Sequence, residues 1–162
     1  RVAARGYHRS VVLGGPPGLR TVRDRETGFA EGFTTGGGGI IDTIPTELTR
    51  ESGAYALSAH AMRALPAGTL IFGVTDVVAI GALSAIRAAG RAVGVDLALA
   101  GFGDIPICRD VTPSLTTVGM PLERIGYLAL RAAIDDEWDP TANPVPLEVL
   151  VRDSTPARET SP

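Results

Sequence analysis

Residues that commonly carry out catalysis are present in this sequence, but without the neighbours they need. His8 and His60 have no Ser, Cys or carboxylate at the spacing of a catalytic triad. Cys108 is the single cysteine and has no CxxC partner, so we expect a buried thiol. Lysine is absent, which excludes a lysine Schiff base and the lysine of a phosphate loop. The sequence therefore predicts a protein that is not an enzyme and that needs no cofactor or metal.

Two glycine-rich stretches lie where phosphate-binding loops could be sought. Residues 36–39 are four glycines, but no Lys-Ser/Thr pair follows them, and they precede a strand-like run instead of a helix. Residues 14–18 read GGPPG, at the place of a dinucleotide fingerprint, yet the spacing is not GxGxxG and the prolines remove amide donors. Neither stretch predicts a nucleotide site.

Polar groups that suit a small metabolite follow four apolar runs of the sequence. Guanidinium, hydroxyl and carboxylate groups occur there beside apolar residues, a mixture that can both orient and contact a small polar ligand. The residues are Leu19, Arg20, Thr21, Arg23, Asp24 and Arg25 after the first run, Thr46, Glu47 and Leu48 after the second, Thr75 and Asp76 after the third, and Phe102, Gly103 and Asp104 after the fourth.

Purely structural roles stay open for these residues. Thr75 and Asp76 stand where a helix begins and could serve only as caps. The arginines between residues 20 and 25 fall on the first turns of a helix, where a solvated charged face is the default. Of these we expect Arg25 to point into a cleft. Gly103 and Asp104 could form only a tight turn.

Alternating strand and helix patterns must position these groups. Strands are predicted at 10–13, 40–44, 70–74, 97–100, 115–118 and 147–151, and helices at 21–33, 49–65, 76–89 and 121–134. Strict alternation predicts an α/β fold with a parallel sheet flanked by helices, and the near-continuous apolar strands fit a sheet covered on both faces. Ligands of such sheets bind outside the carboxyl ends of the strands, where the polar groups above converge.

Composition sets outer bounds on function. The chain has 162 residues with 15 basic and 18 acidic side chains, a net charge of −3, which argues against nucleic-acid binding by this chain itself. The apolar runs are too short to span a membrane. One cysteine fits a reducing compartment, and no signal peptide is visible, so we expect a cytoplasmic protein. The first residue is not Met, and we expect the chain to be part of a longer one.

Six motifs follow one another in order along the chain. They are Gly6-Tyr7-His8-Arg9-Ser10-Val11-Val12-Leu13-Gly14-Gly15-Pro16, Arg25-x-x-Gly28-Phe29, Glu51-Ser52-Gly53, Asp76-x-x-Ala79-Ile80-Gly81-Ala82-Leu83, Gly101-Phe102-Gly103-Asp104-Ile105-Pro106 and Leu115-Thr116-Thr117-Val118. This ordered set resembles the effector-binding core of the LacI/GalR family of bacterial transcription regulators. The resemblance spans roughly residues 6–155 and implies a periplasmic-binding-protein-like, Rossmann-like lobe, with the DNA-binding headpiece and most of the first lobe outside this chain.

The resemblance also implies how the chain is divided. Residues 1–117 would form the C-terminal lobe, 118–151 would contribute a crossover helix and strand to the N-terminal lobe, and 152–162 would be a return segment and polar tail. The helix at 121–134 would then carry an apolar face without its usual lobe, so we expect that face to be exposed, swapped or packed differently. The face consists of Leu122, Ile125, Ala129 and Ala132.

Ligand contacts carried over from the resemblance fall on residues that the strand-end rule had selected. They are Thr21, Arg25, Leu48, Thr75, Gly103 and Asp104, with Asp76 beside them. Gly103 stands where the family usually has an aspartate, and Thr75 where it usually has an asparagine. The ligand is therefore less rich in hydroxyls, or its recognition has shifted to Asp104, and both interpretations remain open.

The resemblance implies an effector-sensing function. A sugar or related polar metabolite would bind between two lobes, and operator DNA would be bound only through the absent headpiece of a homodimer. Helix 76–89 and residues 105–110 are candidate dimer contacts, with ordinary burial against the sheet as the alternative. The rival functions are a solute-binding protein of a transport system and, less favoured, a nucleotide-using α/β enzyme.

Overall fold

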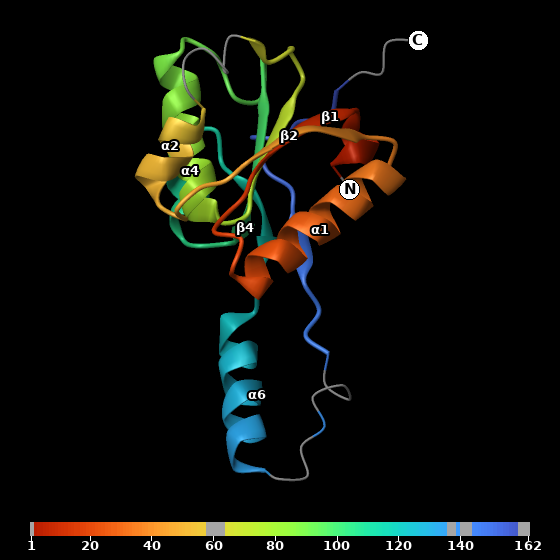
Figure 1. The fold of residues 1–162 in the computed structure, drawn as a ribbon, viewed down its shortest axis with the longest axis vertical. Helices are drawn as coiled ribbons and strands as arrows, with labels where there is room; N and C mark the ends of the chain where they lie inside the picture. Colours follow the sequence, from red (N-terminus) through yellow and green to blue (C-terminus); the bar gives the residue numbers. More distant parts are fainter. Residues whose placement is uncertain (1, 58–63, 136–138, 140–143, 159–162) are drawn as a thin grey trace.

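The chain folds into a six-stranded sheet with helices on both faces (Figure 1). The computed structural model describes residues 2–57, 64–135, 139 and 144–158. The strands are β1 (Arg9–Leu13), β2 (Gly39–Ile44), β3 (Leu70–Gly73), β4 (Ala98–Gly103), β5 (Thr116–Gly119) and β6 (Glu148–Leu150). The helices are η1 (Ala3–Arg5), α1 (Arg20–Thr35), α2 (Arg50–Ala56), α4 (Asp76–Ala88), α5 (Ile107–Asp110) and α6 (Leu122–Ile134).

The sheet has the strand order β2-β1-β3-β4-β5-β6. The first five strands pair in parallel, which confirms the predicted α/β class. The sheet is therefore mostly parallel; the sequence did not predict that β6 pairs antiparallel with β5. The chain leaves the sheet at the end of β5 and returns beside it from the same side, so the returning strand must run in the opposite direction.

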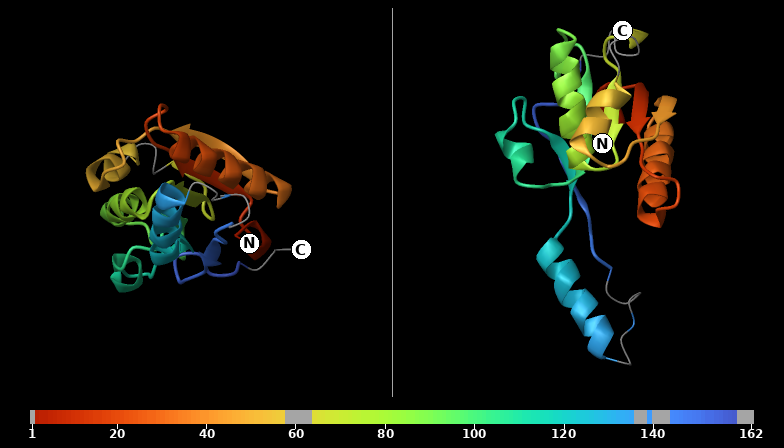
Figure 2. Two further views of the ribbon diagram at one scale, coloured as in Figure 1. Left: turned by 90° about the horizontal axis from the view of Figure 1, so that it is seen from below. Right: turned by 60° about the vertical axis from the view of Figure 1, so that its left-hand side comes forward.

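Helices cover the two faces of the sheet unequally. Figure 2 shows α2 and α4 on one face and α1 on the other. The α4 sequence is apolar nearly all round because the helix is buried twice, against the sheet and against α2. Gly53 and Gly81 allow the close approach of α2 and α4, since a Cβ at either position would collide with backbone of the other helix. Helix 76–89 was considered either as a dimer contact or as a helix buried against the sheet, and burial within the chain accounts for most of its surface.

Hydroxyl caps start two of the predicted helices. The Thr49 side chain accepts a hydrogen bond from the Ser52 amide, and the Ser52 hydroxyl accepts one from the Thr49 amide, which is a capping box. Thr75 caps α4 by accepting from the Val78 amide at 3.3 Å. The helix predicted at 49–65 is described as α2 only to Ala56, and residues 58–63, with His60, lie outside the described residues.

α6 projects from the body of the molecule, which is the sheet with the other helices packed on it (Figure 1). The expected apolar face is not covered by the strands: Leu122 is 60% exposed, Ala129 and Ala132 are exposed, and Ile125 is half-buried. On the same helix Leu130 and Ile134 are 63% and 71% exposed. The expectation of an exposed face is therefore met. β6 pairs with β5 and so lies in the sheet.

No helix among the described residues combines the length and apolar character needed to cross a membrane.

Candidate functional site

Arg25 lies where the ends of β1, β3 and β4 come together. It follows β1 on the second turn of α1, and its Nη1 donates a hydrogen bond to the carbonyl of Val74, just after β3, at 3.0 Å. Its guanidinium lies 4.3 Å from the ring centroid of Phe102 in β4, a cation–π contact. Contacts from two separate segments therefore hold this side chain at the carboxyl edge of the sheet, where the sequence predicted it.

Burial and a nearby carboxylate act on the Arg25 guanidinium in opposite directions. Burial lowers the pKa of Arg25, and the negative charge of Asp76 partly opposes that shift. Among the described residues no carboxylate lies within ion-pair distance of Arg25. Thr21 lies one turn earlier on the same helix and lines the same cavity. A cation and a hydroxyl are thus presented together.

The cavity beside Arg25 has a volume of about 540 Å³ and is mostly apolar. Its aromatic lining includes Phe29, which stacks on Phe72 at 4.1 Å and on Phe33 at 5.4 Å between ring centroids. Residues on its wall are Val2, Ala3, Thr21, Asp24, Arg25, Gly28, Phe29, Gly32, Phe33, Phe72, Ala100, Gly101, Phe102, Thr116, Thr117, Val118, Met120, Leu147 and Val149. The cavity therefore extends along α1 well beyond the strand ends. The predicted site lies at its Arg25 end, where a charged side chain lines it.

Asp76 is bound to neighbouring segments of the body. The residue is 1% exposed, its Oδ1 accepts from the Thr117 hydroxyl at 2.5 Å, and its Oδ2 accepts from the Ile105 amide at 3.0 Å. The carboxylate thus connects the start of α4 to β5 and to the loop after β4. Thr75 uses its hydroxyl as a helix cap, so the capping alternative holds for that side chain.

Asp104 is held by two arginines. Its Oδ1 accepts from Arg152 at 2.6 Å and its Oδ2 from Arg109 at 2.9 Å. Burial raises the pKa of Asp104. The hydrogen bonds and charges of Arg152 and Arg109 lower this pKa by more than burial raises it, so the net shift is downward. Its backbone is left-handed, with φ of 54°. Both carboxylate oxygens therefore already have cationic partners.

Gly103 and Leu48 also adopt positive φ angles. Gly103 has φ of 137°, and a Cβ there would approach the Asp76 carboxylate at 3.1 Å, so a side chain is disfavoured at this position. Leu48 has φ of 60° and packs, partly buried, against the core on both sides of the sheet. Neither residue lines the cavity, and nor do Thr75, Asp76 and Asp104. These five form the surroundings of the strand-end edge, while Thr21 and Arg25 reach into the cavity.

Arg152 and Thr117 are important residues of this edge that the sequence did not single out for it. Arg152 also donates to the Leu115 carbonyl at 2.8 Å, and its amide donates to the Thr116 hydroxyl at 2.8 Å. The segment after β6 is thereby bound between β4 and β5, where Ser154 and Thr155 are buried. No local spacing indicates these contacts, because the partners lie 36 to 48 residues apart in the chain.

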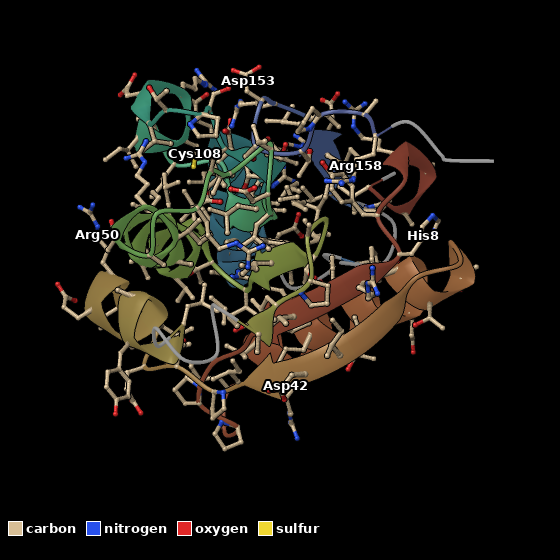
Figure 3. The ribbon with its side chains drawn as sticks, turned by 90° about the horizontal axis from the view of Figure 1, so that it is seen from above. His8, Asp42, Arg50, Cys108, Asp153 and Arg158 are labelled. Atoms are coloured by element: carbon tan, nitrogen blue, oxygen red, sulfur yellow. The ribbon has the colours of Figure 1, made fainter. Side chains whose placement is uncertain are left out.

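The other residues considered for chemistry lie away from this edge or are buried. Figure 3 shows His8 on the opposite side of the molecule from Cys108. Burial, followed by the effect of Asp76, raises the pKa of the Cys108 thiol to about 12. Among residues 2–57, 64–135, 139 and 144–158, no three His, Cys, Asp or Glu side chains cluster as metal ligands would.

A mostly parallel sheet with helices on both faces, and with a cation and a hydroxyl at the carboxyl edge of its parallel strands, is typical of an α/β ligand-binding lobe. Residues 1–155 match the family model described as the periplasmic binding protein-like domain. The transcriptional regulator CelR of Thermobifida fusca is 28% identical over 160 residues, which cover 95% of this chain and 47% of CelR. The ribose operon repressor of Halalkalibacterium halodurans is 28% identical over 151 residues, 91% of this chain and 45% of that repressor.

Solved structures agree with this classification. A LacI-family regulatory protein from Chloroflexus aggregans is 27% identical with a TM-score of 0.78, over 96% of this chain and 58% of that one. The chain belongs to the periplasmic-binding-protein-like domain family, as part of a LacI/GalR effector-binding core. It spans about half the length of the curated relatives it matches.

Proposed function

We propose that this chain is the effector-sensing part of a LacI-type transcriptional regulator. The observation that carries the proposal is the position of Arg25, which Val74 and Phe102 hold at the carboxyl edge of the sheet and which lines the cavity there. The relatives named above are regulators, which favours this function over a solute-binding protein of a transport system. No bond of the ligand would be made or broken, and the whole protein would act in the cytoplasm as a homodimer.

Sensing would operate through the angle between two lobes. Residues 1–117 would form one lobe, 118–151 would carry the crossover helix and strand of the other, and 152–162 would return to the first. A metabolite that contacts both lobes in one arrangement only would shift the population towards it, because a ligand can favour only the state that it binds better. Operator DNA would be bound by a headpiece outside these 162 residues.

The proposed ligand-binding residues differ in whether their side chains line the cavity or already bind other groups of the protein. Arg25 and Thr21 would contact the effector directly. Thr75, Asp76, Gly103 and Asp104 would shape the edge beside it, since Thr75, Asp76 and Asp104 already bind protein groups. Leu48 would offer apolar contact. The ligand class expected at this stage is a small sugar or related polar metabolite.

The test uses the full-length regulator and the DNA fragment upstream of its own gene. Fluorescence anisotropy would measure DNA affinity with each member of a panel of sugars and sugar acids. We expect one metabolite to change that affinity, and Arg25→Ala to weaken the response by about tenfold or more. Arg23→Ala, on the exposed side of α1, is the matched control. DNA affinity that no metabolite alters, or an equal response in Arg25→Ala, would refute the sensing role or the role of Arg25 respectively.

A further inference from the structure

We propose that the effector carries an anionic group, a carboxylate or a phosphate, which binds the guanidinium of Arg25. The inference rests on the proposed function and specifies the chemical class of ligand for that same site. It follows from which hydrogen-bonding groups at the carboxyl edge of the sheet already have partners and which do not.

Arg25 presents donors that the protein does not use. A guanidinium has several N–H donors and no acceptor, and the bond from Nη1 to the Val74 carbonyl occupies only one of them. The Arg25 Cζ lies over the Phe102 ring, 4.3 Å from its centroid, and an aromatic ring offers no lone pair that would use up these donors. Within the described part of the chain, no carboxylate forms an ion pair with it.

Acceptors at the same edge are already engaged. Asp76 accepts from Thr117 and Ile105, and Asp104 accepts from two arginines. On α1, Glu26 accepts from the Gly15 amide at 3.2 Å. Asp24, the one carboxylate on the cavity wall, is exposed and lies 3.6 Å from Arg20. Each of these described carboxylates therefore already has a partner, whereas Arg25 keeps unused donors.

This imbalance favours an anion over a neutral polyol. Each hydroxyl of a neutral sugar carries a proton that needs an acceptor, and a buried donor left without an acceptor is destabilising. A carboxylate or phosphate is acceptor-only and matches the planar fork of an arginine, so it requires only what the edge supplies.

The surroundings strengthen such a pair. Phe102 lies directly against the guanidinium, and Phe29 and Phe72 stack at 4.1 Å on the same cavity wall. Apolar walls reduce competition from water and raise the energy of a charge-assisted hydrogen bond. Burial also lowers the pKa of Arg25, a cost to the charged form that a bound anion would offset.

The test is a titration of the full-length regulator followed by NMR with selectively labelled arginine and threonine, which detects weak binding and assigns it to residues. D-Galactose is compared with D-galacturonate and D-galactose 6-phosphate, which differ from it in one charged group, and with inorganic phosphate, all at one ionic strength. We expect an anionic probe to shift the Arg25 Nε–Hε and Thr21 amide signals with a Kd about tenfold or more below that of galactose. Arg25→Gln should remove this binding, and Arg23→Gln should leave it unchanged.

The arms separate the sources of the anionic group. Binding of galacturonate alone identifies a carboxylate ligand, and binding of the two phosphates alone identifies a phosphate ligand. Galactose binding as tightly as its charged analogues, an anion that binds equally to Arg25→Gln, or no shift with any anion would each overturn the inference. None of these results decides whether a metabolite controls DNA binding in the full-length regulator, which the anisotropy experiment tests separately.

Discussion

Arg25 and Asp104 show how side chains of opposite charge at one edge acquire different roles. Arg25 is fixed through a carbonyl and an aromatic ring, so its charge remains available to a ligand. Asp104 is fixed through Arg109 and Arg152, so its charge is largely compensated within the protein. The partners of each side chain, more than the residue type, decide which can bind an effector.

Replacing Arg152 tests the role of Asp104 in stability. In Arg152→Gln, Asp104 loses its more buried partner, and we expect the free energy of unfolding to fall by about 1–3 kcal/mol at pH 7. Arg109→Gln removes a partner that is 67% exposed, so it should cost less than about 1 kcal/mol. Urea denaturation of the two variants and the wild type measures the difference. Equal losses would show that the Arg152 pair contributes no more than a surface ion pair.

The same pair predicts a dependence of stability on pH. Because the folded pKa of Asp104 lies below its unfolded value of about 3.9, its contribution is complete above that value and is lost as pH falls through the folded pKa. We expect wild-type stability to decline below about pH 4, and the decline to be shallower in Arg152→Gln. Urea midpoints measured across this range provide the check, and parallel curves would contradict the assignment to Asp104.

The reactivity of Cys108 measures how often α5 opens and exposes the buried thiol. Its thiol is fully buried, and burial with the effect of Asp76 raises its pKa to about 12, so little thiolate exists at neutral pH. We expect iodoacetamide to modify the native protein at least about 100-fold more slowly than the urea-unfolded protein. Mass spectrometry at timed intervals measures both rates. Rapid labelling without urea would mean that α5 opens readily.

At the scale of elements, short-range sequence patterns predicted where most helices and strands lie. How the strands pair depends on residues far apart in the chain. Apolar runs located the six strands of the sheet, and the helices predicted from residues 49 and 76 begin at Arg50 and Asp76. The short helix α5 and the antiparallel direction of β6 were not predicted, because neither follows from periodicity within a window. For the site, strand ends predicted the convergence on Arg25, but Arg152 reaches Asp104 across 48 residues, which no local spacing encodes.

Contact between α2 and α4 depends on a glycine. In Gly81→Ala the added Cβ would meet the backbone of α2, so we expect a loss of about 1–3 kcal/mol in the free energy of unfolding. Gly32→Ala in α1 is the control, because open space surrounds that position and alanine favours a helix by about 1 kcal/mol. Thermal denaturation followed by circular dichroism compares them. A neutral Gly81→Ala would show that the two helices can separate without cost.

At the scale of the whole molecule, different interactions stabilise the body and attach the projecting helix α6 to it. The body is held by apolar clusters on both faces of the sheet. α6 is joined to it by the paired strands β5 and β6, and Arg152 fixes the chain where it re-enters the body. A change of angle between the two would therefore involve the few residues between Gly119 and α6 and those around β6, which is where a lobe-closing movement would be expected to act.

Two leucine-to-alanine substitutions measure this separation directly. Leu83 in α4 is 2% exposed, so Leu83→Ala should lower the free energy of unfolding of the chain by about 2–5 kcal/mol. Leu130 in α6 is 63% exposed, so Leu130→Ala should change it by no more than about 0.5 kcal/mol. Both variants lose the same group of atoms, so a difference in their free energies of unfolding reflects the environment of each leucine. Urea denaturation at low protein concentration measures both. If Leu130→Ala cost as much as Leu83→Ala, α6 would be packed in solution, and the segment between the paired strands could not be the exposed part of a second lobe.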